Sequence, residues 1–122
     1  METKSKCFED LLVWKKMHNV VLNVYKLTNK FPRSELFGIT NQLRRAAVSV
    51  SANIVEGYSK ISKADKLRFY NIAQGSLEEA DYFLLLSKDL GFAETEELRR
   101  KVDEVGRMLK GYMHSVSKSM KN

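Results

Sequence analysis

Apolar side chains recur every three or four positions along almost the whole chain, which is the period of one face of an α-helix. The 122 residues include a single proline, Pro32, and only six glycines. A β-sandwich or a barrel of short strands needs many more turn residues than this. The pattern therefore predicts an all-α protein, an antiparallel up-and-down four-helix bundle that forms a single domain over residues 1–122.

Turn and capping residues divide the first half of the chain into two helices. The first is predicted over about residues 8–28, and Pro32 prevents its continuation. The second is predicted to begin at Ser34, whose hydroxyl can cap it, and to reach about residue 55 or 56. Gly57 is then expected to end this helix by adopting a left-handed conformation.

Two further helices are predicted in the second half of the chain. Ser62 begins the third, with Asp65 three residues later as in a capping box, and Gly91 ends it before the fourth follows. Gly75 and Gly106 would lie inside these two helices, where each glycine costs about 1 kcal/mol relative to alanine. We interpret these two glycines as points of close helix approach, within the bundle or between subunits.

The positions predicted to face the core share the three-and-four spacing on each helix. On the first two helices they are Leu11, Trp14, Met17, Val21, Val24, Thr28, Leu36, Ile39, Leu43, Ala47, Val50 and Ile54. On the third they are Phe69, Ala73, Ser76, Ala80, Phe83, Ser87 and Leu90, with Tyr70, Leu77 and Leu84 beside them. On the fourth they are Leu98, Val102, Val105, Leu109, Tyr112 or Met113, and Val116.

The net charge of +6 is distributed unevenly along the chain. Residues 1–77 carry 13 basic and 6 acidic side chains, a net of +7, whereas residues 78–104 carry 4 and 9, a net of −5, and residues 105–122 carry 4 and none, a net of +4. Between residues 11 and 34 there is no acid, and this stretch could attract a polyanion, be met by the acidic segment 78–104, or form a solvated face. Its basic side chains are Lys15, Lys16, Lys26, Lys30 and Arg33.

Arg44 and Arg45 stand side by side in the second predicted helix, among small residues such as Ala46 and Ala47. An unpaired arginine cannot be buried without a cost of several kcal/mol. Both side chains must therefore reach a carboxylate, solvent or an anionic ligand.

A second basic cluster follows this helix. Basic side chains interleaved with an aromatic ring can hold a phosphate backbone and stack a base, although surface lysines are also common for other reasons. The cluster comprises Tyr58, Lys60, Lys63, Lys66 and Arg68, with Asp65 as its only acid.

Catalytic, metal and cofactor chemistry finds little support in the sequence. His18 and His114 are isolated and belong to no metal-binding pattern, and Cys7 is the only cysteine. We therefore predict a protein that is not an enzyme and holds no metal and no cofactor. No run of about 18 apolar residues occurs, so we expect no membrane association, and the single cysteine and the lack of a signal-peptide core favour the cytoplasm.

A resemblance to a known family rests on residues 8–14, 43–50 and 53–58, with further matches at Arg68, Phe69 and Ala73 and over 75–77 and 104–109. These segments resemble the family of proteins encoded by intervening sequences in bacterial 23S ribosomal RNA genes. The resemblance implies a four-helix bundle that assembles into a homopentameric ring. It also implies a distant similarity to the accessory variability protein of diversity-generating retroelements, which is basic and works with a reverse transcriptase and its template RNA.

The sequence departs from this family at one position of the second helix. Family members commonly have a proline after the position matched by Val50, and this chain has Ser51 there. Because a proline removes a backbone hydrogen bond and bends a helix, we expect the second helix to be straighter than is usual for the family.

Charge segregation and the resemblance together predict an oligomeric, non-enzymatic accessory protein that binds RNA or DNA. In a pentamer each basic stripe is repeated, so a modest patch becomes a multivalent phosphate-binding surface. The alternative is a protein-interaction scaffold, for example a partner of a reverse transcriptase or another polymerase, whose arginines serve subunit contacts. The candidate nucleic-acid contacts are Lys15, Lys16, Arg44, Arg45, Tyr58, Lys60, Lys63, Lys66 and Arg68.

Overall fold

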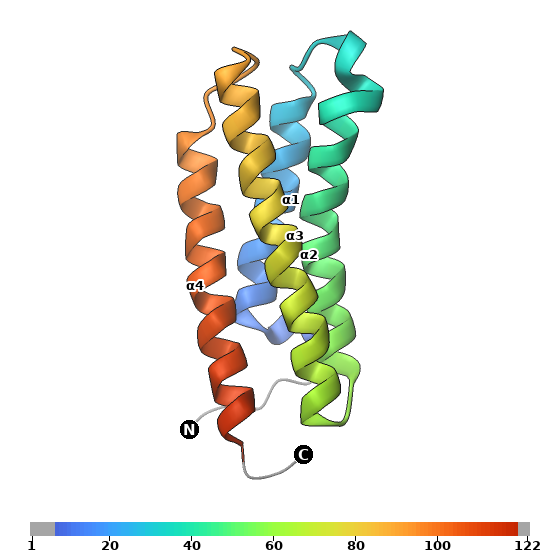
Figure 1. Ribbon diagram of the computed structural model, residues 1–122, viewed down its shortest axis with the longest axis vertical. Coiled ribbons are helices and arrows are strands. Elements are labelled where there is room, and N and C mark those ends of the chain that lie inside the picture. The colour runs from blue at the N-terminus through green and yellow to red at the C-terminus, as the bar shows by residue number, and fades with distance from the viewer. Residues whose placement is uncertain (1–6, 120–122) are drawn as a thin grey trace.

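The computed structural model describes residues 7–119. Four long helices dominate it: α1 (Leu12–Thr28), α2 (Asn41–Ser59), α3 (Lys63–Asp89) and α4 (Glu96–Lys118). Consecutive helices run in opposite directions and pack side by side (Figure 1), and the described residues contain no strand. The predicted all-α four-helix bundle is confirmed.

The core is made of apolar side chains from all four helices, as the three-and-four spacing predicts for most positions of α2 to α4. On α3, however, Leu90 is 53% exposed and Phe69 is half-buried, although both were predicted to face the core.

On α1, Met17, Val24 and Thr28 are buried as predicted, but two of the other predicted positions are displaced by one residue. Val13 and Val20 are 5% and 1% exposed, whereas Trp14 and Val21 are only partly buried at the edge of the core. Both sets satisfy the helical period, so the spacing alone does not distinguish which of two neighbouring stripes faces inward. Among residues 7–119, no helix is both long and apolar enough to cross a membrane.

The starts of the first two helices differ from the prediction. Leu11 has extended backbone angles (φ −73°, ψ 124°), so α1 begins at Leu12 and the preceding turn is the separate 3-10 helix η1 (Phe8–Asp10). Ser34 lies inside the 3-10 helix η2 (Arg33–Glu35) and caps no helix. Phe8 continues the three-residue spacing of Leu11 and Trp14, and Ser34 with Glu35 resembles a capped first turn, which is why the sequence suggests longer helices.

An irregular segment joins η2 to α2. The π-helix η3 (Leu36–Thr40) contains Gly38 with non-helical angles (φ −109°, ψ −117°), and it leaves Leu36 47% exposed rather than in the core. From Asn41 onward α2 is regular, and it continues through Ser51 without interruption. The second helix therefore starts later than predicted.

Gly57 is an interior residue of α2, and the prediction that it ends this helix is wrong. A Cβ at this position would lie 2.4 Å from Cε1 of Tyr70, a fully buried ring on α3. The Tyr70 hydroxyl lies 3.5 Å from the hydroxyl of Tyr112. The pKa of Tyr70 is raised, mainly because the ring is buried. Glycine at residue 57 is therefore required by a close contact between α2 and α3.

The two ends of α3 agree with the prediction. The backbone amide of Asp65 donates to Oγ of Ser62 at 3.1 Å, so Ser62 caps the helix. At the other end Gly91 has a positive φ of 80°, and its amide donates to the carbonyl of Lys88 at 2.9 Å. Among the described residues Gly91 is the only one with a positive φ.

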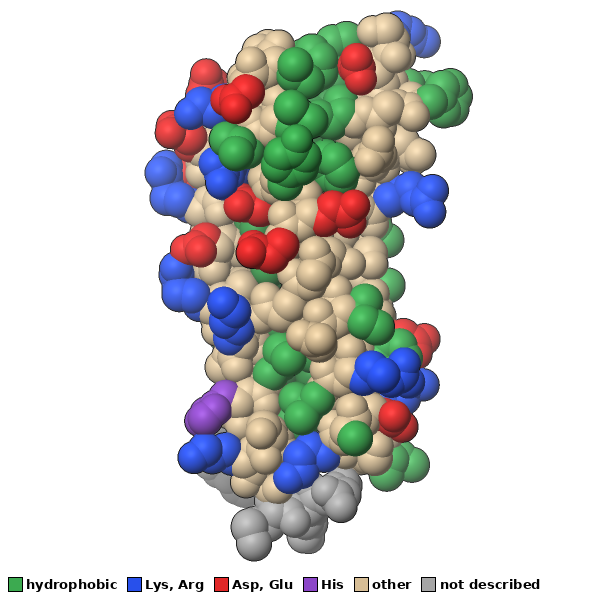
Figure 2. Space-filling model, viewed as in Figure 1, with side chains coloured by type: hydrophobic (Ala, Val, Ile, Leu, Met, Phe, Trp, Pro, Cys, Tyr) green, Lys and Arg blue, Asp and Glu red, His purple; other side chains and the backbone are tan. Residues whose placement is uncertain are grey.

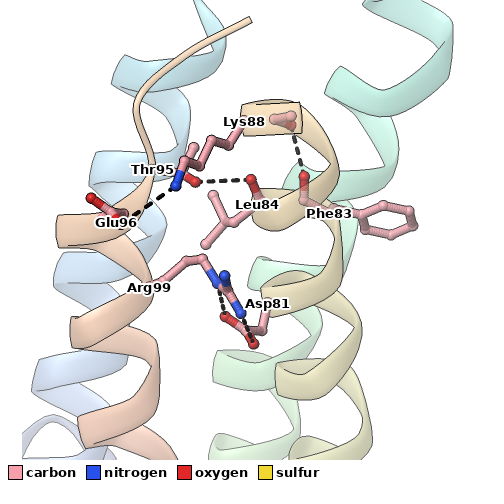
Figure 3. Close-up of polar contacts among 8 residues, drawn as sticks. Asp81, Phe83, Leu84, Lys88, Thr95, Glu96 and Arg99 are labelled. Atoms are coloured by element: carbon pink, nitrogen blue, oxygen red, sulfur yellow. Dashed lines mark hydrogen bonds and ion pairs between the residues drawn. The ribbon is translucent and has the colours of Figure 1, made fainter. Parts of the chain in front are cut away.

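Polar contacts fix α4 against the end of α3 (Figure 3). The buried hydroxyl of Thr95 donates to the carbonyl of Leu84 at 2.9 Å, just before α4 begins. One turn further, Arg99 forms two hydrogen bonds to the carboxylate of Asp81, at 2.9 and 3.1 Å. The pKa of Arg99 is raised, mainly by its hydrogen bond to Asp81. These contacts set the register of α4 on α3.

The glycines inside α3 and α4 do not mark close approach within the bundle. A Cβ at Gly75 would meet no atom within 4 Å, and one at Gly106 would meet only Cδ2 of Leu77 at an ordinary 3.4 Å. Both glycines instead line an open groove of 570 Å³ between the two helices. The interpretation as close approach between subunits stays a prediction.

Candidate nucleic-acid interface

Lys66 of the predicted basic cluster lies in the first turn of α3, and its side chain reaches the C-terminal end of α2. Its ammonium donates to the carbonyls of Tyr58 at 2.8 Å and Gly57 at 3.3 Å. Burial lowers the pKa of Lys66. The last carbonyls of a helix carry partial negative charge and have no partner within the helix, so this lysine stabilises the end of α2.

Lys63 has the same role at the end of α4. Its ammonium donates to the carbonyls of Ser119 at 2.6 Å and Ser117 at 3.2 Å. Two of the predicted nucleic-acid contacts are therefore engaged with backbone groups of the bundle. Reversing their charge would alter the helix ends as well as the surface charge.

Three other predicted contacts have a carboxylate partner. In each pair both side chains are at least one-third exposed, so the pairs contribute little to stability and the cations stay accessible to solvent. The ion pair between Lys16 of α1 and Glu104 of α4 shows that the acidic segment 78–104 meets part of the basic stretch. The pairs are Lys16–Glu104 at 3.5 Å, Lys60–Glu56 at 3.5 Å and Arg68–Asp65 at 3.9 Å.

The predicted aromatic contact, Tyr58, is half-buried beside Lys66, whose ammonium lies 5.6 Å from the ring centroid. Phe69 is also half-buried, with Lys60 and Arg68 over its ring at 5.1 and 4.5 Å. Because both rings are already half-buried, the cations cover part of the small ring surface that still faces solvent. The cluster therefore offers less free aromatic surface than its sequence suggests.

Arg44 is half-buried between α1 and α2 and meets neutral acceptors. Its Nε donates to Oγ1 of Thr28 at 2.8 Å and its Nη2 donates to Oδ1 of Asn29 at 3.1 Å. Thr28 is itself buried, and its hydroxyl donates to the carbonyl of Val24 at 2.7 Å. The guanidinium also lies 4.7 Å from the ring centroid of Tyr25. Within the described residues no carboxylate forms an ion pair with Arg44, so its charge is fixed in position without a counter-ion.

Arg45 is exposed beside it, and in the described part of the chain it has no ion-pair partner. Glu79 of α3 lines a neighbouring groove with Arg45 but forms no ion pair with it. Both arginines line a shallow groove of 450 Å³ between α1 and α2. Its other lining residues are Tyr25, Asn41, Val48 and Ser49.

The basic stretch before residue 34 lies largely on α1, which contains no acidic residue. Lys15, Lys26 and Lys30 are exposed, and across residues 7–119 none of the three has an ion-pair partner. Two grooves of 360 and 580 Å³ run between α1 and α4, and Lys101 of α4 lines both. Three glutamates also line these grooves, so the field there is reduced but not cancelled: Glu94, Glu97 and Glu104.

We call the resulting surface the α1 face. It joins the free lysines of the first helix to the arginine pair of α2 on one side and to Lys101 of α4 on the other. Sequence reasoning missed Lys101 because it lies in the acidic segment. The members of the α1 face are Lys15, Lys16, Tyr25, Lys26, Lys30, Arg44, Arg45 and Lys101.

The side of the bundle opposite α1 has a different charge pattern. Figure 2 shows α3 in front, with α4 beside it, and acidic side chains gather over the upper half of this view. A polyanion would meet repulsion there and attraction at the α1 face. Among the nine predicted contacts, Lys15 and Lys16 line the groove between α1 and α4, and Arg44 and Arg45 line the groove between α1 and α2. The remaining five predicted residues lie at or near the turn between α2 and α3. Binding of nucleic acid by any of the nine residues stays a prediction.

Comparison with known proteins identifies the sequence family. The family model described as 23S rRNA-intervening sequence protein matches residues 9–111. No curated protein matches the chain.

A solved structure shares the fold. It is a protein with unknown function from the S23 ribosomal protein family from Bacteroides thetaiotaomicron, with a TM-score of 0.78 and 23% sequence identity over 84% of this chain and 98% of that one. At this identity the similarity shows the four-helix fold alone.

Proposed function

The chain belongs to the family of 23S rRNA-intervening sequence proteins, and from that premise we propose that it is a non-enzymatic accessory protein that binds RNA or DNA through the α1 face. The observation that carries the proposal is the set of fixed or exposed cations on this face that lack a carboxylate partner among the described residues. Phosphates can take the place of the missing partners. The role requires no metal and no cofactor, and it would place the protein in the cytoplasm.

Salt dependence tests this proposal directly. If Lys15, Lys26, Lys30 and Lys101 each neutralise one phosphate of a single strand, log affinity should fall with log salt with a slope of roughly 2.8. Affinity for a labelled RNA should then drop about fiftyfold between about 50 and 200 mM salt, as measured by fluorescence anisotropy. Absence of binding at about 50 mM salt, where screening is weakest, would reject the proposal.

We further propose that the protein acts as a homo-oligomer, a pentamer by the family resemblance. Supporting this, Gly75 and Gly106 keep the α3–α4 groove open although no contact inside the bundle requires either glycine. Size-exclusion chromatography coupled to light scattering should give a mass of about five chains at micromolar concentration. A monomer under these conditions would remove the multivalent part of the argument.

A protein-interaction scaffold, for example a partner of a reverse transcriptase, is the second candidate function. It is favoured by large apolar side chains on the surface, since Phe37 and Ile61 are 91% and 89% exposed and Tyr82 is 55% exposed. Green side chains gather near the upper end of the view in Figure 2. Binding to such a partner through apolar burial should change little with salt, in contrast to phosphate binding.

A further inference from the structure

We propose that the α1 face binds single-stranded RNA in preference to duplex RNA, because unpaired bases stack on the ring of Tyr25. This inference rests on the proposed function and names the kind of nucleic acid that the same face takes. Tyr25 remains 42% exposed although the guanidinium of Arg44 lies over its ring, 4.7 Å from the centroid. The guanidinium occupies one face of this ring, so a base stacks on the other face while its phosphate meets the fixed cation.

The neighbours of Tyr25 supply what a nucleotide needs. The same groove holds the free guanidinium of Arg45 and the polar side chains of Asn41 and Ser49, in a volume of 450 Å³. Lys26 follows Tyr25 directly on α1 and lines the groove toward α4. The backbone of a strand that stacks a base on this ring therefore passes cations on both sides.

A second ring extends the platform along α1. His18 is exposed and stacks on Trp14, with ring centroids 4.8 Å apart and an interplanar angle of 10°. It precedes Tyr25 by two helical turns, so the two rings lie on the same side of α1, about 10 Å apart along its axis. A single strand that follows α1 can therefore meet both rings.

Bases in a duplex are already stacked and paired, so they cannot reach Tyr25 without unstacking. The cations of the α1 face still attract the phosphates of a duplex. Loss of the Tyr25 ring should therefore affect single strands alone, whereas loss of a cation should affect both kinds of RNA.

The test measures binding of a labelled, unstructured RNA of about 12 nucleotides, and of a duplex of the same length, by fluorescence anisotropy. Tyr25→Leu should weaken single-strand binding roughly five- to hundredfold and leave duplex binding within about twofold. Tyr25→Phe, which keeps the ring, should bind both RNAs as the wild type does. The matched control is Tyr82→Leu on α3, which removes a ring of similar exposure, 55%, outside the α1 face and should change neither affinity.

The outcomes separate this inference from the function on which it rests. If the wild type binds duplex as tightly as single strands, or if Tyr25→Leu binds single strands normally, the stacking inference is overturned and phosphate binding stands. If the wild type binds neither RNA, both are overturned. Circular dichroism of each variant confirms that the bundle is intact, so that a loss of binding is not a loss of fold.

Discussion

Replacing Gly57 with alanine is expected to lower the free energy of unfolding by about 1–3 kcal/mol, although alanine is the better helix former. A Cβ at residue 57 would lie 2.4, 2.7 and 2.9 Å from Cε1, Cδ1 and Cζ of Tyr70. Because Tyr70 is fully buried, its ring cannot turn into solvent, and α2 and α3 must separate to accept the methyl group. Urea unfolding followed by circular dichroism measures the effect.

Gly111→Ala, inside α4 and outside the α3–α4 groove, is the matched control for this prediction. It makes the same change inside a helix at a position where a Cβ meets no atom within 4 Å. With no contact to oppose helix propensity, it should raise the free energy of unfolding by about 0.5–1 kcal/mol. If both variants are stabilised alike, the close contact between Gly57 and Tyr70 is not present in solution.

These glycines also show what the sequence can and cannot predict about the fold. Gly91 was correctly expected to end α3, because a left-handed residue after a helix is a local requirement. Gly57 looks like the same signal in the sequence. Glycine is required there for a different reason, because a Cβ would meet the ring of Tyr70 on another helix. The helical class and most core positions followed from periodicity, which is also a local property.

The candidate surface was predictable only in part, for a similar reason. The sequence indicated that α1 is basic and free of acids, and the structure leaves Lys15, Lys26 and Lys30 exposed there. It gave no sign that Lys63 and Lys66 reach carbonyls at the ends of α4 and α2, because those distances depend on how the helices pack. Net charge along a segment therefore overstates the number of cations that are free to bind a ligand.

Reversing two lysines of the α1 face, Lys15→Glu with Lys26→Glu, should weaken RNA binding at low salt by at least roughly thirtyfold. Each phosphate contact of a single strand contributes roughly 1 kcal/mol through counterion release at about 50 mM salt, and each introduced glutamate adds repulsion. Neither lysine has an ion-pair partner among residues 7–119, so the stability of the bundle should change by less than about 0.5 kcal/mol for each substitution. Anisotropy titrations over a salt series give both the affinity and its slope.

The control is an equal change of net charge elsewhere, Lys110→Glu with Lys118→Glu. Lys110 lines the α3–α4 groove, Lys118 lies in the last turn of α4, and in the described structure both lack ion-pair partners. If the α1 face is the binding surface, the control should retain most of the affinity and the salt slope, whereas the α1 variant should lose affinity and about half of the slope, which falls to roughly 1.4. An equal loss in the two variants would mean that RNA responds to the total charge of the protein rather than to this face. Because the mass of each oligomer can be remeasured, a loss caused by altered assembly is separable from a loss of phosphate contacts.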